Sequence, residues 1–210
     1  ARRIIVGMGG SASTDGGLGA VDAMGSPARY RGVELLGACD VRTRFTDAAE
    51  VFGPQKGASD AHIRLLTGRL ERLIQVYEER YGVDISAMDR AGAAGGLAGG
   101  LAARGAQLVD GVDLVAEEVR LDEHLAGADL VVTGEGRLDA TSMAGKVVGG
   151  VAAYAAAAGV PLLVVVGSAD PDVIVPGDVL SLVDLFGLDR AQTDTGACVT
   201  EAVAGWLAGR

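Results

Sequence analysis

Short apolar runs alternate along the chain with segments whose apolar residues recur every three to four positions. The runs are bounded by Gly, Pro, Asp or Ser and predict strands at 3–6, 34–41, 129–133, 162–166 and 179–186. The clearest helix begins after Ser59, a good N-cap residue, and ends before Gly82. This alternation predicts an α/β fold with a mainly parallel sheet and helices on both faces.

The chain has 210 residues, which one large α/β region can accommodate. We treat 1–210 as one such region, in which only the stretch 84–90 could mark an internal boundary. The first apolar run follows residue 1 almost at once, so we expect the sequence to enter its fold part-way through. Because parallel sheets gather ligands at the carboxyl ends of their strands, the loops after the strands are the places to look for a site.

Charge and cysteine content exclude several functional classes. The formal net charge is −10 and no cluster of Lys and Arg occurs, which argues against a nucleic-acid partner. Cys39 and Cys198 form no Cys-x-x-Cys pair, so we expect a reducing, cytoplasmic environment. The uncharged stretch 147–169 is long enough for a membrane span, but Gly159-Val160-Pro161 divides it. A helix, a turn and a buried strand fit it better, and no membrane partner is expected.

The first predicted strand leads into a loop of small and polar residues, Gly7 to Gly17, of a type that suits phosphate. Its Gly9, Gly10, Ser11, Ser13 and Asp15 are candidate ligand-binding residues. The spacing Gly7-x-Gly9-x-x-Ala12 also fits a dinucleotide fingerprint, but the acidic residue that this motif needs is poorly placed. A tight turn without any ligand remains an alternative.

Lysine occurs only at Lys56 and Lys146 among 18 cations, and both positions lie beside glycine. A compact ammonium at these places could face phosphate or carboxylate oxygens. Lys146 is not a Walker A lysine, because that motif needs Gly at 140 and Ser or Thr at 147. Chance in the composition is the alternative explanation.

A third candidate follows the strand predicted at 129–133, in the segment 133–141. We expect a glycine-bracketed loop in which Glu135 and Asp139 hold Mg²⁺ or accept a hydroxyl proton, and Arg137 binds an anionic group. Asp40 ends another predicted strand in the same way. A solvated salt-bridged turn and a helix cap are the alternatives for these two places.

The glycine-rich stretch 91–101 is unfavourable for a helix by propensity alone. Either close backbone packing or contact with a ligand could explain its composition. The histidines, His62 and His124, lie beside charged residues, and we expect both at the surface. No nucleophile-elbow motif supports a serine hydrolase.

Taken together and in this order, the motifs resemble those of the bacterial type I glycerate kinase family. The segments that carry the resemblance are 5–17, 39–41, 51–58, 91–97, 129–139 and 145–146. The resemblance implies ATP- and Mg²⁺-dependent phosphorylation of D-glycerate, usually at the 2-hydroxyl, on a fold of two α/β domains with a cleft between them. It fits the residues present, because phosphoryl transfer needs mainly positioning and neutralisation of charge.

On this basis the candidate residues fall into three groups. The candidate catalytic residues are Asp40, Lys56, Glu135, Arg137 and Asp139. The candidate ATP-binding residues are Gly9, Gly10, Ser11, Ser13, Asp15 and Lys146. The candidate Mg²⁺ ligands are Asp15, Glu135 and Asp139.

The sequence also departs from the family pattern. Family members carry about as much chain again before this point, and the segments after Asp40 and around 24–33 are shorter here. A kinase for another small hydroxy acid, an NAD-dependent oxidoreductase and a non-catalytic small-molecule-binding relative therefore remain alternatives. The oligomeric state stays open.

Overall fold

The computed structural model describes residues 1–143 and 147–209, which form two compact units, Ala1–Gly111 and Val112–Arg210. Each is described by itself below as unit 1 and unit 2. The stretch 84–90, the one internal boundary considered from the sequence, lies inside unit 1.

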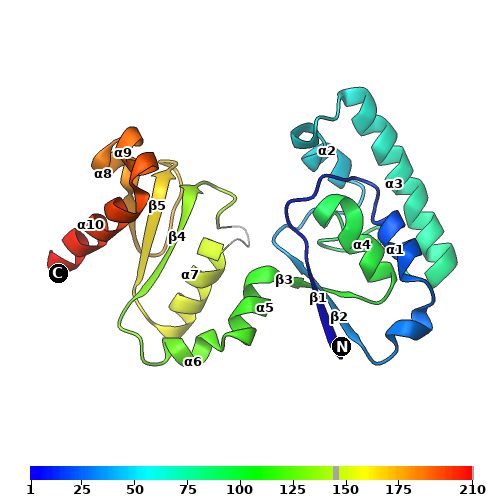
Figure 1. The fold of residues 1–210 in the computed structure, drawn as a ribbon, viewed down its shortest axis with the longest axis horizontal. Helices are drawn as coiled ribbons and strands as arrows, with labels where there is room; N and C mark the ends of the chain where they lie inside the picture. The colour runs from blue at the N-terminus through cyan, green and yellow to red at the C-terminus, as the bar shows by residue number, and fades with distance from the viewer. Residues whose placement is uncertain (144–146, 210) are drawn as a thin grey trace. The chain divides into compact units, whose positions relative to one another are not determined.

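Unit 1 is a three-stranded sheet with helices packed against it (Figure 1). Its elements are β1 (Arg3–Gly7), α1 (Leu18–Met24), η1 (Pro27–Tyr30), β2 (Glu34–Cys39), α2 (Ala48–Phe52), η2 (Pro54–Lys56), α3 (Asp60–Tyr81), η3 (Ala93–Gly96), α4 (Leu97–Ala103) and β3 (Gln107–Asp110). The strand order is β1-β2-β3, and both pairings are parallel. The carboxyl ends of all three strands therefore lie at one edge of the sheet.

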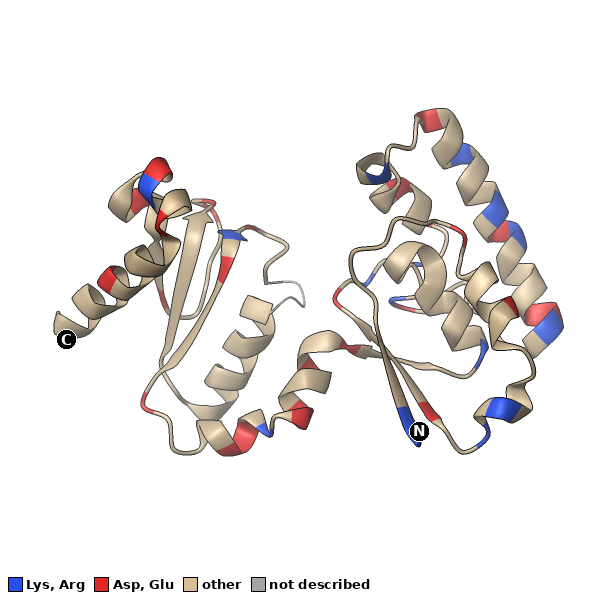
Figure 2. Ribbon diagram, viewed as in Figure 1, with Lys and Arg blue, Asp and Glu red and all other residues tan. Residues whose placement is uncertain are grey.

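The long helix α3 forms where the sequence predicts it. Ser59 accepts a hydrogen bond from the His62 N–H at 3.4 Å, and Gly82 ends the helix in the left-handed region at φ 70°. Its buried residues Leu70, Leu73 and Tyr77 join the core of unit 1 with Phe45. Figure 2 shows several basic segments along this helix.

Unit 2 holds a second parallel sheet, of order β4-β5-β6. Helix α5 (Gly111–Glu118) begins at the division between the units. The elements that follow are α6 (Leu121–Leu125), β4 (Val131–Leu138), α7 (Val147–Ala158), β5 (Leu162–Ala169), β6 (Asp178–Ser181), α8 (Leu182–Phe186), α9 (Leu188–Thr193) and α10 (Thr195–Ala208). Alternate residues of β5 pack on opposite sides, Val164 with α7 and Leu163 with Cys198 of α10. The expected α/β class, with parallel strands flanked by helices, is confirmed.

Two local expectations are corrected, and one strand, β3, was not predicted from the sequence. Residues 182–186 form helix α8 and not the end of a strand, because Ser181 accepts a hydrogen bond from the Asp184 N–H at 3.3 Å and so caps a helix. Strand β3 has no apolar run long enough to signal it. The strand expected at 129–133 continues to Leu138 as β4, because its pairing with β5 continues to Ala169.

The glycine-rich stretch 91–101 is helical in part, against its propensity. Its glycines are needed for close packing. A Cβ at Gly95 would lie 2.0 Å from the Ser13 carbonyl oxygen, and one at Gly99 would lie 2.4 Å from the Phe45 ring. Tertiary contact thus outweighs local preference here, and the packing interpretation is supported for these residues.

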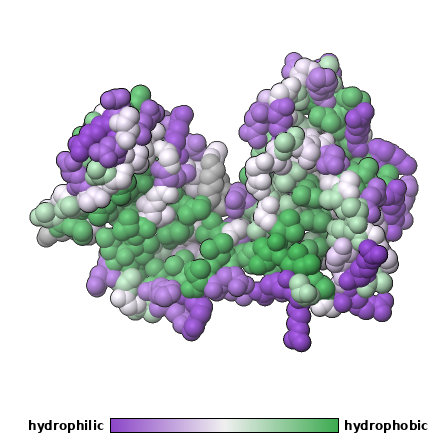
Figure 3. Space-filling view, viewed as in Figure 1, coloured by the Kyte–Doolittle hydropathy of each residue, from purple (hydrophilic) through white to green (hydrophobic). Residues whose placement is uncertain are grey.

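Helix α7 carries no charged residue, and Figure 3 shows an apolar surface over it. Within the described ranges, no helix combines the length and the apolar character that a membrane crossing requires.

Candidate functional site

The loop after β1 is held by Lys56, which comes from η2 and lies 45 positions away from Ser11. The Lys56 ammonium donates to Ser11 Oγ at 2.9 Å and to the Ser13 carbonyl at 2.6 Å, with Thr14 Oγ1 at 3.5 Å. Burial lowers the pKa of Lys56, because removal from water disfavours its charged form. The structure thus joins two of the sequence motifs, the glycine loop and the lysine.

The far end of this loop is anchored in the core. Gly16 donates its N–H to the Gly95 carbonyl at 3.0 Å, and its own carbonyl accepts from the buried Tyr77 hydroxyl at 2.9 Å. Gly16 has φ +65°, and a Cβ there would lie 2.4 Å from Leu73 Cδ2. Only glycine meets both conditions. Burial raises the pKa of Tyr77, so this hydroxyl keeps the proton it donates.

The middle of the loop is open. A Cβ on Gly9 or Gly10 would meet nothing within 4 Å, and both residues are exposed. Their backbone is free to approach a ligand. The dinucleotide fingerprint finds no support, because β1 ends at Gly7 and the next helix begins only at Leu18. Such a fingerprint needs its glycines to open the helix directly.

Asp40 follows β2 at the sheet edge where the glycine loop leaves β1, since Gly7 pairs with Ala38. Its carboxylate is exposed and lies beside Gly111, where a Cβ would come within 2.3 Å of Asp40 Oδ1. A side chain at position 111 would therefore displace the Asp40 carboxylate from this position. Asp40 and the loop thus share one edge of unit 1, as the sequence predicts.

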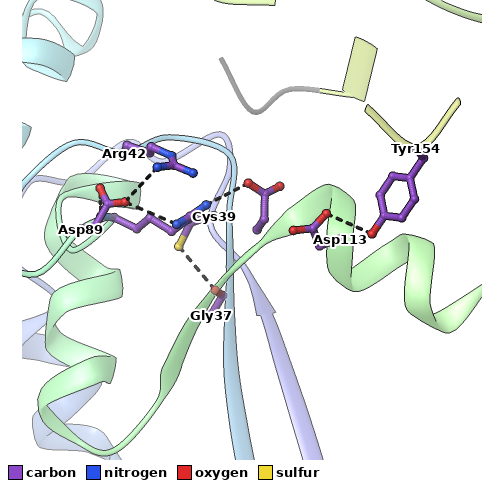
Figure 4. A network of polar contacts seen from close by, with 8 residues as sticks. Gly37, Cys39, Arg42, Asp89, Asp113 and Tyr154 are labelled. Atoms are coloured by element: carbon purple, nitrogen blue, oxygen red, sulfur yellow. Dashed lines mark hydrogen bonds and ion pairs between the residues drawn. The ribbon is translucent and has the colours of Figure 1, made fainter. Parts of the chain in front are cut away.

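A half-buried ion pair between Arg90 and Asp110 lies at the same edge. Arg90 Nη2 lies 2.9 Å from Asp110 Oδ2, and Arg90 also lies near Asp89, at 3.5 Å. The Arg90 side chain is only 14% exposed, and its φ of 68° is rare for a residue other than glycine. In Figure 4 the neighbouring Cys39 thiol points to the Gly37 carbonyl at 3.5 Å. Burial raises the pKa of Cys39 to about 11, which favours the protonated thiol over the thiolate at neutral pH.

In unit 2 the expected loop at 133–141 is mostly strand, which changes the setting of Glu135. Glu135 lies within β4 opposite Val166, and its Oε1 is buried without a hydrogen-bond partner among the described residues. Position 134 in this strand requires glycine, because the Cβ of any other residue would lie 2.1 Å from the Val165 carbonyl oxygen. A buried carboxylate oxygen without a partner is costly, so its presence points to a ligand, proton or cation.

Arg137 and Asp139 lie near the end of β4 and already have partners. Arg137 Nη2 lies 3.0 Å from Asp170 Oδ1, and the Arg137 side chain is exposed. Asp139 Oδ1 accepts from the Thr141 N–H at 2.8 Å and from the Thr141 hydroxyl at 2.5 Å. The alternative of a solvated, salt-bridged turn therefore accounts for these contacts that the two side chains make.

Among the expected Mg²⁺ ligands, Asp15 belongs to unit 1, and Glu135 and Asp139 belong to unit 2. Within residues 1–143 and 147–209, no group of three or more His, Cys, Asp or Glu side chains could hold a metal by itself. Lys146 lies outside the described residues. Both histidines are exposed, as expected.

Sequence reasoning missed the residues that support the candidates from a distance. Tyr77 belongs to the regular apolar face of the helix predicted after Ser59, a pattern that indicates only core packing, but its hydroxyl fixes the glycine loop. Asp110 is the last residue of the short strand β3, whose only sequence signal is Leu108-Val109 before an acidic residue.

The chain matches the model of the glycerate kinase family over residues 26–202. It is 36% identical over 205 residues to the glycerate 2-kinase of Escherichia coli K12, with 82% of this chain and 54% of that protein covered. It is 41% identical over 179 residues to an uncharacterised protein of Mycobacterium tuberculosis, with 82% and 47% covered. The chain thus spans about half the length of the curated relatives it matches.

A solved structure agrees with these sequence matches. The crystal structure of a protein assigned as glycerate kinase 2 from Salmonella typhimurium LT2 aligns with a TM-score of 0.74 and 33% identity. The alignment covers 99% of this chain and 65% of that one. The match to the family model, the sequence relatives and the shared fold lead to one conclusion: the chain belongs to the glycerate kinase family.

Proposed function

We propose that the protein transfers the γ-phosphoryl group of ATP to a hydroxyl of D-glycerate, with Mg²⁺, and that the product is 2-phosphoglycerate. The observation that carries the proposal is the glycine loop of unit 1, held by Lys56 and open at Gly9 and Gly10, in a chain of this family. Glycine loops that expose backbone N–H groups suit phosphate, because the N–H dipoles face the anion and no Cβ intervenes.

In the proposed reaction the acceptor hydroxyl oxygen forms a bond to the γ-phosphorus while the bond to the bridging oxygen of ADP breaks. The hydroxyl proton passes to a carboxylate. Glu135 is the best candidate for that base, because its Oε1 is buried and unpartnered among the described residues. Asp40 and Asp139 are the other candidates. A carboxylate without hydrogen-bond donors is free to accept a proton.

The remaining candidates would position and neutralise charge. Lys56 keeps Ser11 and Ser13 in place, and its ammonium adds positive charge beside the phosphate loop. Arg137 and Lys146 are the candidate anion-binding cations in the other unit. Glycerate is itself an anion, so one of these cations is expected to contact its carboxylate.

The residues present fit a bound Mg²⁺. Mg²⁺ is commonly held by one or two carboxylates together with substrate phosphates, so it needs no preformed cage of acids. The candidate ligands are Asp15 in unit 1 and Glu135 and Asp139 in unit 2. The unpartnered oxygen of Glu135 suits either role, and if it holds Mg²⁺ the proton passes to Asp40 or Asp139 instead. When bound, Mg²⁺ would neutralise charge on the phosphate oxygens.

The test is a measurement of ADP release by the full-length protein with ATP, Mg²⁺ and D-glycerate, followed by NMR identification of the product. We expect turnover that requires all three and gives the 2-phosphate. Turnover to the 3-phosphate would correct the assigned hydroxyl. Failure to turn over D-glycerate, combined with turnover of another hydroxy acid in a product screen, would overturn the substrate and keep the kinase.

A further inference from the structure

Two adjoining hollows lie in unit 1 between the glycine loop and α3. The smaller one, here the cationic hollow, has a volume of about 310 Å³ and is lined by Lys56, His62 and Arg69 with no acidic side chain. The larger one, here the apolar hollow, has a volume of about 530 Å³. Both contain Thr14, Leu66 and Arg69 in their walls, so they form one trough. Both volumes lie within the ~300–1,000 Å³ typical of small-molecule sites.

The sequence builds this trough on one face of a helix. His62, Leu66 and Arg69 recur every three to four positions, and the series continues along α3 into the apolar hollow. The apolar hollow has Leu18, Leu66, Leu70, Leu73 and Val76 in its walls. Leu70 and Leu73 also lie against Gly16, so the fixed end of the glycine loop closes one side of the trough.

The charged side chains around the trough differ in whether they already have hydrogen-bond or ion-pair partners. Arg69 makes no ion pair or hydrogen bond within the part of the chain that the structure describes, whereas Arg80 pairs with Asp22 at 3.1 Å and Arg72 lies 3.6 Å from Glu79. Lys56 donates hydrogen bonds to Ser11 Oγ and to the Ser13 carbonyl oxygen, so its ammonium already has partners in the loop. Asp15 is the one carboxylate in the walls of the two hollows, and its Oδ1 accepts from the Gly17 N–H at 3.1 Å.

We propose that the trough is the nucleotide site, with the triphosphate in the cationic hollow and the adenine base in the apolar hollow. This inference rests on the proposed function and names the place of its phosphoryl donor. A nucleotide combines a polyanion with a planar base of low polarity, which matches a cationic and an apolar compartment side by side. Glycerate has no apolar part and would leave the larger hollow uncovered. Arg69, at the junction, is the residue expected to bind the phosphates.

The test compares two exposed arginines on α3. Arg69→Ala removes the cation at the junction, and Arg64→Ala is its matched control, because Arg64 lines a different hollow together with Glu50, Asp60 and Glu71. Calorimetric titration of the full-length protein with ATP, without glycerate, is expected to show binding about tenfold weaker for Arg69→Ala and within about twofold of wild type for Arg64→Ala. Thermal melts check that both variants fold.

A second pair of probes separates the two hollows. Arg69→Ala is expected to weaken the binding of inorganic tripolyphosphate and of ATP, and to leave the binding of adenosine unchanged. Val76→Asp places a charge in the apolar hollow. It is expected to weaken the binding of adenosine and of ATP, and to leave the binding of tripolyphosphate unchanged. This double pattern is expected only if one molecule occupies both hollows.

The outcomes are distinct from those of the proposed function. Suppose that Arg69→Ala lowers the affinity for ATP tenfold but the wild-type protein does not phosphorylate D-glycerate. This result would support the trough as the nucleotide site and overturn the proposed reaction. Normal turnover with ATP affinity unchanged in Arg69→Ala would overturn the trough alone. A rise in the KM for glycerate, with the Kd for ATP unchanged, would overturn it too, because the cationic hollow would then hold the acceptor. Absence of ATP binding by the wild type would also overturn it.

Discussion

The two units offer different chemistry and build it in different ways. Unit 1 presents a backbone loop and cations, and its site depends on contacts between residues distant in sequence, such as Lys56 with Ser11. Unit 2 presents carboxylates on and just after one strand, and Asp139 is held by its near neighbour Thr141. Backbone N–H groups and cations suit the phosphates of a donor, whereas a carboxylate with a buried, unpartnered oxygen suits proton transfer. We therefore expect mutations in unit 1 to change binding and mutations in unit 2 to change turnover.

The largest effect is expected from Glu135→Gln in unit 2. The change keeps the size of the side chain but removes the carboxylate, so kcat is expected to fall by about 10²–10⁴-fold if Glu135 takes the proton. Steady-state kinetics on the full-length protein measure it. Glu117→Gln, an exposed position in the same unit, is the control and should keep normal kcat. A normal kcat for Glu135→Gln would remove Glu135 from the mechanism.

The next effect is expected from Gly95→Ala in unit 1. The new Cβ would meet the Ser13 carbonyl oxygen, and the residue has φ +67°, so both packing and backbone oppose the change. We expect a loss of about 1–3 kcal/mol in the free energy of unfolding, measured by urea denaturation, with weaker ATP binding in the variant that still folds. Gly68→Ala is the matched control, because no atom lies near its Cβ. Equal stability of the two variants would contradict the packing argument.

An effect in the same range, from the loss of one hydrogen bond without a steric clash, is expected from Tyr77→Phe. The change removes the donor to the Gly16 carbonyl and leaves that buried oxygen unpartnered, at a cost of about 1–3 kcal/mol. Tyr81→Phe, in the same helix and in ring contact with Tyr77, controls for loss of a hydroxyl. Urea denaturation gives the stability, and the Kd for ATP reports on the loop. A Kd unchanged in a destabilised variant would show that this end of the loop does not shape the site.

The smallest effect at neutral pH is expected from Lys56→Arg, which keeps the charge. Burial lowers the pKa of Lys56 from 10.5, so the ammonium loses its proton at a lower pH than an ordinary lysine. The kcat/KM of the wild type is therefore expected to decline on the alkaline side with an apparent pKa below 10.5. Arginine stays protonated there, so the variant should move this decline to higher pH. An alkaline limb that is identical in both proteins would assign it to another group.

The sequence predicted much of the fold because its signals are local. Helix α3 has a cap at each end and a regular apolar face, and the first four predicted strands form in order. The expectation for 182–186 was wrong because Leu182-Val183-Asp184-Leu185-Phe186 suits a strand or a helix equally, and only the Ser181 cap decides between them.

The sequence by itself determined the parallel α/β class, the places of the glycine loop and of Asp40, and the residue types available for phosphoryl transfer, since period, capping and strand ends depend on neighbouring residues. Only the tertiary structure decided that Lys56 holds the glycine loop, that Glu135 lies in a strand with a buried unpartnered oxygen, and that α3 forms a trough with Arg69 at its junction. These features depend on strand pairing and on contacts between distant segments, which fix burial and hydrogen-bond partners but leave no local pattern in the sequence.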